Sequence, residues 1–318
     1  MKRFLSHATV ILLLVIPTAV AQETLTVQER LGYPPDARLL IIHADDLGMA
    51  HSVNRASFEA LERGWITSAS VMVPTPWFPE VARFARTHPE ADLGIHLTLN
   101  SEWTDYRWGP LTPRAKVPSL LDEHGYFPLV EEPVVARATP EEIEQELRAQ
   151  IDKAQAAGIA ISHLDSHMAV LFRSEPLFDV YRKVSTSYGI PMLLESKGTR
   201  GGSESPWAKP SREALVDRVV SIGPGVSIAD WPEAYERILR PLPPGVYQLI
   251  VHLAYSDDEM RGATWDHPDW GAAWRQADFD LVGSERFRSF LKQQKFVLID
   301  WRELARAGSF SAGEKPQE

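Results

Sequence analysis

The sequence predicts an α/β fold, an irregular (β/α) barrel of parallel strands in a single domain with long loop insertions. Short apolar runs alternate with helical stretches along most of the chain. Several of these runs are apolar at nearly every position, as expected of parallel strands that helices cover on both faces. About seven strands occur with no glycine-rich nucleotide loop after the first, which favours a barrel over an open sheet.

Strands are predicted at the short apolar runs of the chain. They are Arg38–His43, Ala69–Val73, Leu93–Leu97, Ala160–Leu164, Pro191–Leu194, Val246–His252 and Phe296–Asp300. In a (β/α) arrangement the carboxyl ends of the strands meet at one rim, and ligands bind there. The side chains at these strand ends are therefore the first candidates for a functional site.

Helices are predicted between the strands. They are Ser52–Arg63, Pro79–Thr87, Thr139–Ala157, Glu175–Tyr188 and Ser284–Gln294. Gly64 follows the first helix as a C-cap. The residues from Thr139 to Glu142 form a capping-box sequence with proline at the first helical position. These signals support the β-α alternation.

Two long segments, Asn100–Ala138 and Lys197–Ala229, are rich in Pro, Gly or Ser. Each is longer than a passive connection usually is, so we expect active-site lids or insertions there. The polar tail Gly308–Glu318 is expected to fray.

The composition excludes several classes of function. The chain has 318 residues, of which 44% are hydrophobic and 24% charged, as in an ordinary globular protein. Its formal net charge of −10 disfavours nucleic acid and anionic membrane surfaces as partners. The absence of cysteine excludes disulfides, a thiol nucleophile and a thiolate zinc site.

The first 21 residues resemble a signal peptide. Lys2 and Arg3 precede the apolar stretch Ala8–Ile16, and Ala19-Val20-Ala21 fits a cleavage site before Gln22. The stretch is short for a bilayer span of roughly 20 residues, so we expect export to the periplasm or medium without stable membrane insertion. An uncleaved anchor is the alternative. The mature domain would be 22–318, with a core at about 37–304 and a charge of −12, since two positive charges are removed.

Aspartate and histidine side chains occur at the ends of four predicted strands. They are Asp45 and Asp46, His96, the alternating His163, Asp165 and His167, and His252. A buried carboxylate pair must be paired, hydrated or bound to a metal, because unpaired charge is costly to bury. Imidazoles and a carboxylate at one rim predict a metal-assisted hydrolase with open positions for water and substrate.

The strand ends also resemble a known family. The matching motifs are His43-Ala44-Asp45-Asp46-Leu47-Gly48, Gly94-Ile95-His96-Leu97-Thr98-Leu99, His163-Leu164-Asp165-Ser166-His167, and Val251-His252. In these motifs the chain resembles the YdjC/ChbG-like carbohydrate deacetylases, which are related in chemistry to the polysaccharide deacetylases. The resemblance runs from about Ala37 to Leu304 and implies a distorted (β/α) barrel.

The resemblance implies a role for each matching residue. Asp46, His96 and His167 would hold one divalent metal ion. Asp45 would be the catalytic base and His252 the acid that protonates the leaving amine. The implied reaction removes N-acetyl groups from amino sugars, oligosaccharides or glycoconjugates and releases acetate. Magnesium and zinc are the expected ions, with manganese, cobalt and nickel as alternatives.

The chain departs from the family pattern at two places. Met168-Ala169-Val170-Leu171 follows His167, where many relatives have further histidines. Leu253 replaces the proline that follows the last histidine. The first change bears on the class of substrate, and the second bears on the backbone around His252.

The remaining candidates admit two interpretations each. Trp265, Trp270 and Arg261 are predicted to bind substrate, since indole rings stack on sugars and guanidinium groups bind anions. The alternatives are loop anchors for the tryptophans and an ordinary salt bridge for the arginine. The same choice applies to Trp103, Tyr106, Trp108, Trp274 and Arg275. We expect His43 to support the site. His163 is open between a direct role and a buttressing one, and Asp165 is open between supporting a ligand and a structural role.

Two other functions compete with a deacetylase acting on a small carbohydrate or glycoconjugate. One is a different metallohydrolase, such as a phosphoesterase, which would need clustered Arg or Lys near the site. The other is a non-catalytic exported carbohydrate-binding protein, which would have lost a ligand or the base. The oligomeric state is not predicted.

Overall fold

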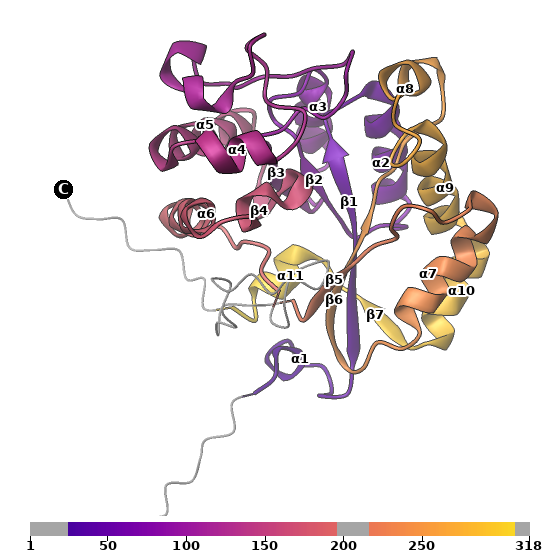
Figure 1. The fold of residues 1–318 in the computed structure, drawn as a ribbon. Coiled ribbons are helices and arrows are strands. Elements are labelled where there is room, and N and C mark those ends of the chain that lie inside the picture. Colours follow the sequence, from indigo (N-terminus) through magenta and orange to yellow (C-terminus); the bar gives the residue numbers. More distant parts are fainter. Residues whose placement is uncertain (1–24, 196–215, 309–318) are drawn as a thin grey trace, which may run out of the picture.

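A long central strand, β1 (Arg38–Leu47), organises the fold (Figure 1). In the computed structural model, which describes residues 25–195 and 216–308, β1 pairs in parallel with β6 from Arg38 to Ala44. The other edge of β1 is shared, because its first three residues pair with β7 and later residues pair with β2. Every residue of β1 after Arg38 is buried, so this strand forms the core of the sheet.

Within the described residues the strands form one seven-stranded parallel sheet. Its order is β4-β3-β2-β1-β6-β5, with β7 paired to β1. The other strands are β2 (Ser68–Val71), β3 (Leu93–Leu97), β4 (Ile161–Ser166), β5 (Arg218–Val220), β6 (Gly245–Val251) and β7 (Phe296–Leu298). The parallel sheet with helices around it confirms the predicted single-domain α/β fold with a distorted barrel.

The barrel closes only loosely between β4 and β5. Met192 pairs with Leu164 of β4, and Glu195 pairs with Val216, just before β5. The predicted strand Pro191–Leu194 is therefore wrong, because only isolated bridges form there. Proline has no N–H to donate, so Pro191 contributes only its carbonyl, 2.8 Å from the Leu164 nitrogen.

Helices cover the outside of the sheet (Figure 1). They are α1 (Val27–Arg30), α2 (His51–Glu62), α3 (Phe78–Thr87), α4 (Glu132–Arg137), α5 (Pro140–Ala156), α6 (Glu175–Tyr188), α7 (Trp231–Leu239), α8 (Asp258–Ala263), α9 (Ala272–Gly283), α10 (Glu285–Gln293) and α11 (Trp301–Ala305). The five predicted helices correspond to α2, α3, α5, α6 and α10, and α7 and α9 were not predicted. In the described ranges no helix is both long and apolar enough to cross a bilayer.

The predicted insertion Asn100–Ala138 packs against the fold rather than standing away from it. It contains α4 and the short 3-10 turns η1 (Arg114–Lys116) and η2 (Pro118–Leu120). Trp103 and Trp108 are buried, which makes them anchors of the insertion. Ser119 donates to the carboxylate of Glu142 at the start of α5, so Glu142 binds the insertion instead of completing the expected capping box.

The interior of the barrel changes from apolar to polar along β1. Leu39 and Ile41 face an apolar cluster with Trp301, whereas Leu40 and Ile42, which alternate with them, face the larger core under the helices. Because successive side chains of a strand alternate, His43 and Asp45 continue the interior face. His163 stacks on Trp301 with ring centroids 4.6 Å apart, so a layer of buried histidine separates the apolar floor from the rim.

Three predicted segments lie wholly or partly outside the described residues. These are the signal segment 1–21, the tail Gly308–Glu318 beyond its first residue, and much of Lys197–Ala229. The described end of the last segment contains β5 and the 3-10 turn η4 (Ile228–Asp230).

Candidate metal centre

The aspartate pair lies within β1, not after it. The sequence analysis ended this strand at His43, but the structure continues it to Leu47. The register with β2 shifts between Ala44 and Leu47, and Asp46 has a φ of 72°, a left-handed conformation uncommon outside glycine. This irregularity explains how two adjacent carboxylates both face the same cluster, since a regular strand would turn them to opposite faces.

Asp46, His96 and His167 form a compact buried cluster. The Oδ1 atom of Asp46 lies 3.5 Å from His96 Nε2 and 3.4 Å from His167 Nδ1. That oxygen is buried and, among the described residues, has no hydrogen-bond partner. Ligand atoms of a single divalent ion typically lie about 3 to 3.5 Å apart. The residues therefore fit a divalent ion held by two imidazoles and one carboxylate.

A second carboxylate supports each imidazole from behind. His96 Nδ1 donates to Asp165 Oδ1 at 2.7 Å, and His167 Nε2 donates to Glu102 Oε2 at 2.9 Å. Burial alone would lower the pKa of both imidazoles, but Asp165 raises the pKa of His96 and Glu102 raises that of His167 to about 10. Such carboxylate–histidine pairs fix the ring and strengthen it as a metal ligand.

Two other groups of ligand atoms lie close enough to hold an ion. They are His43 with His163 and Asp165, and Asp45 with His96 and Asp165. Both rely on Asp165, which already accepts from His96 and lies 3.1 Å from His43 Nε2. His43 Nδ1 is 3.0 Å from Ser68 Oγ, so both ring nitrogens of His43 have hydrogen-bond partners. Histidines thus engage both carboxylate oxygens of Asp165, which favours the Asp46 cluster as the metal centre.

Asp45 lies beside the cluster and faces His252. Its Oδ2 atom is 3.9 Å from His96 Nε2 and 3.8 Å from His252 Nε2. Its other oxygen is 3.3 Å from His43 Nε2. Burial raises the pKa of Asp45, against the attraction of the neighbouring histidines. The arrangement suits a carboxylate that accepts a proton and a histidine that delivers one.

Helix α9 supports the site from the side of β6. Arg275 Nη2 lies 2.8 Å from Asp46 Oδ2, and both side chains are buried. Burial alone would raise the pKa of Asp46, but the guanidinium group holds it well below its usual range. Asp278 accepts the backbone N–H of His252 at 2.9 Å, together with Trp231 Nε1 and the Tyr235 hydroxyl. The Asp278 carboxylate therefore holds the backbone at His252, the position beside the departure at Leu253.

The residues predicted to bind substrate lie around α8 and the connection to α9. Trp265 is 65% exposed and Trp270 is 37% exposed. Arg261 lies 2.6 Å from Asp258 in an exposed ion pair. Trp274, by contrast, is buried and stacks on Trp270, so it anchors this connection. The exposed rings are available at the surface.

Several supporting residues were not predicted as such from the sequence. Arg275 was considered as an anion-binding group, and it forms the ordinary salt bridge that was the alternative. Glu102 and Asp278 carried no motif. Glu102 lies in the insertion and Asp278 on the buried face of α9. Their supporting roles could be recognised only once the positions of both elements in the fold were known.

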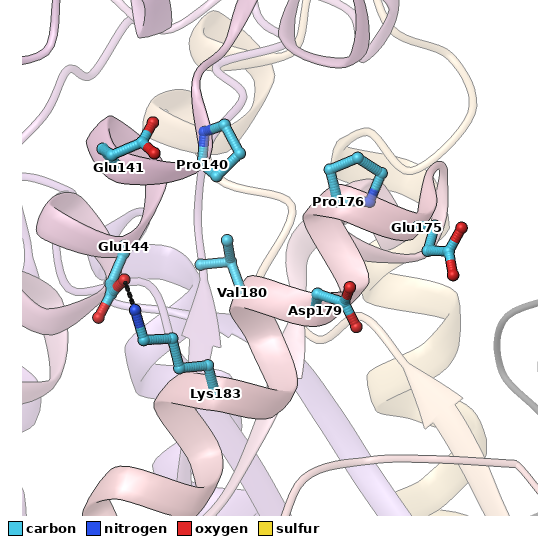
Figure 2. Close-up of a pocket in the computed structure, with 8 residues that line it drawn as sticks. All are labelled: Pro140, Glu141, Glu144, Glu175, Pro176, Asp179, Val180 and Lys183. Carbon is cyan, nitrogen blue, oxygen red and sulfur yellow. Dashed lines mark hydrogen bonds and ion pairs between the residues drawn. The ribbon is translucent and has the colours of Figure 1, made fainter.

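A surface pocket of about 470 Å³ lies between α5 and α6, away from the cluster (Figure 2). Its walls include Pro140, Glu141, Glu144, Glu175, Pro176, Asp179, Val180 and Lys183. Lys183 Nζ lies 2.6 Å from Glu144 Oε2, so the basic group is already paired. None of the lining residues is a histidine, and the pocket is not the metal centre.

Comparisons with known proteins agree with this geometry. The model of the YdjC-like protein family matches residues 39–293. A carbohydrate deacetylase of Thermus thermophilus is 36% identical, over 88% of this chain and 98% of its own. A carbohydrate deacetylase of Brevibacillus brevis is 28% identical, over 83% of this chain and 99% of its own.

A solved structure shows the same fold. It is the crystal structure of an Enterococcus faecalis V583 protein provisionally assigned to cellobiose-phosphate cleavage, and its TM-score is 0.71. It is 24% identical and covers 84% of this chain and 99% of its own.

Proposed function

Since this chain belongs to the YdjC-like protein family, we propose that it is a metal-dependent carbohydrate deacetylase that removes N-acetyl groups from amino sugars, oligosaccharides or glycoconjugates. The main support is the cluster of Asp46, His96 and His167, in which one buried carboxylate oxygen has no hydrogen-bond partner in the part of the chain that the structure describes. The names of the relatives support a hydrolase of non-peptide C–N bonds. The products are acetate and a free amine.

The proposed cofactor is one divalent ion, magnesium or zinc, held by these three residues. When bound, such an ion would polarise the acetyl carbonyl and activate the attacking water. Two imidazoles and a carboxylate suit zinc, and magnesium would complete its shell with waters. The donor set fits either ion, so metal content has to be measured.

Two residues of the protein, Asp45 and His252, each carry out one of the proton transfers. Asp45 takes the proton of the attacking water, since its Oδ2 atom faces His96 of the cluster and His252, while its Oδ1 atom lies on the side of His43. His252 protonates the departing amine nitrogen, because its ring lies across from Asp45 at the end of β6. Arg275 keeps Asp46 charged, which preserves a ligand at neutral pH.

The surface beside the site would receive the sugar. We place Trp265 and Trp270 as faces on which sugar rings stack, because both are exposed in the connection between α8 and α9. Arg261 would contact an acidic or hydroxyl group of a larger substrate, although its ion pair with Asp258 must then open.

The competing functions are less well supported. A phosphoesterase needs cations beside the metal, yet Arg275 is committed to Asp46 in a buried pair and Arg261 is paired at the surface. A non-catalytic carbohydrate-binding protein would not need to retain the base and the acid, and Asp45 and His252 both face the cluster.

The direct test is acetate release from a panel of N-acetylglucosamine monomers, oligomers and glycoconjugates, with and without a chelator. We expect release that the chelator abolishes and that added metal restores. Phosphate esters in parallel reactions test the phosphoesterase. Acetate release that is unaffected by exhaustive chelation would reject the metal, and no release from any substrate with any metal would reject the deacetylase.

We also propose that the mature protein begins at Gln22 and acts outside the cytoplasm. The positive residues Lys2 and Arg3, the apolar stretch Ala8–Ile16 and the small residues before Gln22 support this. Mass spectrometry of the protein purified from cell fractions tests it. An intact N-terminus in a cytoplasmic fraction would reject export.

A further inference from the structure

Two segments meet beside the metal cluster in an antiparallel set of contacts. Residues 102–105 come from the insertion after β3, and residues 265–267 come from the connection between α8 and α9. His267 Nε2 donates to the Glu102 carbonyl at 3.2 Å, and Trp265 Nε1 donates to Asp105 Oδ2 at 2.8 Å. Between them, Thr104 lies close enough to the Asp266 carboxylate to lower its pKa. We call this pairing of residues 102–105 with 265–267 the clasp.

Glu102 connects the clasp to the cluster. Its carboxylate accepts from His167 Nε2 at 2.9 Å, while its backbone carbonyl accepts from His267. One residue therefore touches both a proposed metal ligand and the segment that carries Trp265. The contact with His167 joins residues 65 apart in sequence, so it depends on how the insertion packs.

The two histidines of the cluster differ in what holds them. His96 lies in β3, and its supporting carboxylate, Asp165, lies in the neighbouring strand β4. His167 instead begins a 3-10 turn, η3 (His167–Phe172), in which Met168 and Ala169 have left-handed φ values of 50° and 55°. Since a strand fixes a side chain better than an irregular turn, the ring of His167 relies more on its hydrogen bond to Glu102.

We propose that Glu102 is a positioning residue for His167 and that, through the clasp, it couples the metal centre to the segment carrying Trp265 and Trp270. This inference rests on the proposed metal centre. Carboxylates behind metal-bound imidazoles orient the ring and raise its basicity, and their loss typically weakens metal binding about 10- to 100-fold. A bound ion would in turn hold His167, Glu102 and the clasp in one arrangement.

The first experiment measures Zn²⁺ affinity of the metal-free protein by competition with a chromophoric chelator. We expect Glu102→Ala to bind Zn²⁺ about 10- to 100-fold more weakly than the wild type, and Glu102→Gln to lose less because it keeps an acceptor oxygen. The control is Glu62→Ala, since Glu62 lies 3.3 Å from a ring nitrogen of His88 in a surface pair. It should bind Zn²⁺ as the wild type does.

The outcomes separate this inference from the proposed function. Wild-type affinity in Glu102→Ala and Glu102→Gln would overturn the positioning role while leaving the metal centre intact. No Zn²⁺ binding by the wild type would reject the metal centre itself, and the inference with it. Should Glu102→Ala fail to fold, the nearly isosteric Glu102→Gln decides alone, because equal affinity to wild type then overturns the role.

The second experiment tests the link through the clasp by hydrogen–deuterium exchange of residues 264–271. In the wild type, Zn²⁺ should slow exchange there. His267→Ala and Asp105→Ala should keep Zn²⁺ affinity within about threefold of wild type, since the Glu102–His167 pair remains, but should lose most of the slowing. Equal Zn²⁺-dependent slowing in both variants, or none in the wild type, would overturn the link.

Discussion

At the scale of single residues, Asp45 and Asp46 show how neighbours decide the chemistry of identical side chains. Arg275 holds the pKa of Asp46 low and leaves one oxygen facing two imidazoles. Burial raises the pKa of Asp45, which is in contact with histidines and, within residues 25–195 and 216–308, pairs with no arginine or lysine. The first side chain is suited to stay charged as a ligand, and the second is suited to exchange a proton.

This division of roles predicts different defects in two variants. Asp45→Asn should retain bound metal and lose at least about 100-fold in kcat, because only the proton acceptor is removed. His96→Ala should lose the metal as well as the activity. Metal content by elemental analysis, beside kcat for acetate release, checks both. Loss of metal from Asp45→Asn would assign Asp45 to the ligands instead.

Gly94 lies one layer of side chains below the rim, and a larger residue there should clash with the His163 ring. A Cβ atom at this position would lie 2.3 Å from His163 Cε1, and that ring is itself stacked on Trp301. Gly94→Ala should therefore lower the free energy of unfolding by about 1 to 3 kcal/mol. Urea denaturation checks this, with Gly223→Ala as the control because no atom of the described residues lies within 4 Å of the position that its Cβ atom would take. Equal free energies of unfolding in the two variants would contradict the prediction and show that His163 can move to accommodate the added methyl group.

The sequence predicted the cluster better than its supports. Asp46, His96 and His167 each lie at or near the carboxyl end of a strand, so the geometry of a parallel sheet brings them together. Glu102 reaches His167 from an irregular insertion, where neither periodicity nor spacing predicts position. The place of Asp165 behind His96 follows from strand register, which becomes certain only once β3 and β4 are paired.

At the scale of elements, α9 serves two parts of the site. Arg275 and Asp278 are three residues apart and therefore share a helix face. The first pairs with Asp46 of β1, and the second accepts the backbone N–H of His252 after β6. A displacement of this helix would move the proposed ligand and the proposed acid together.

Asp278 predicts a pH dependence of stability. Burial raises its pKa from 3.8 to about 6, although its hydrogen bonds oppose the rise. The folded state thus binds the proton more tightly than the unfolded state. The resulting stabilisation is complete below about pH 4 and is lost as the pH rises through 6, a change of about 3 kcal/mol at most.

Unfolding in urea between pH 4 and 7.5 checks this dependence. The stability of the wild type relative to Asp278→Asn should fall as the pH rises through 6, because the asparagine does not titrate. Asp280→Asn, a change at an exposed residue of the same helix, should leave the profile as in the wild type. A difference between wild type and Asp278→Asn that is constant with pH would contradict the prediction.

Helices could be predicted from the sequence where the local pattern of residues agrees with the way the helix packs in the fold. The five predicted helices lie within one residue of the observed ends. α7 was not predicted, although Trp231, Ala234 and Tyr235 are buried at helical spacing. The neighbouring helix α9 is buried on much of its surface. Its sequence therefore shows little difference between an apolar and a polar face, and that difference is what predicts a surface helix.

At the scale of the whole molecule, the barrel concentrates its ionisable groups at one end. The apolar layer around Trp301 gives way to His43 and His163, and then to the carboxylates and imidazoles of the rim. An apolar floor of this kind keeps water and mobile counter-ions away from the lower side of the cluster. Arg275 pairs with one oxygen of Asp46, and the other oxygen faces the imidazoles, where a bound ion would give it a partner, because buried charge without a partner is costly.

The need to balance this buried charge predicts that a bound metal ion raises the free energy of unfolding of the whole domain. An ion that binds only the native state adds about 2.7 kcal/mol when its concentration is 100 times the Kd. For a domain of this size, such a gain raises the Tm by several degrees. Thermal unfolding with chelator and with added Zn²⁺ or Mg²⁺ measures it, and the more effective ion indicates which metal the site prefers. His96→Ala is the matched control, since it removes a proposed ligand that lies in a strand. A Tm that does not respond to either ion would argue against a metal centre, and an equal response in His96→Ala would place the binding elsewhere in the protein.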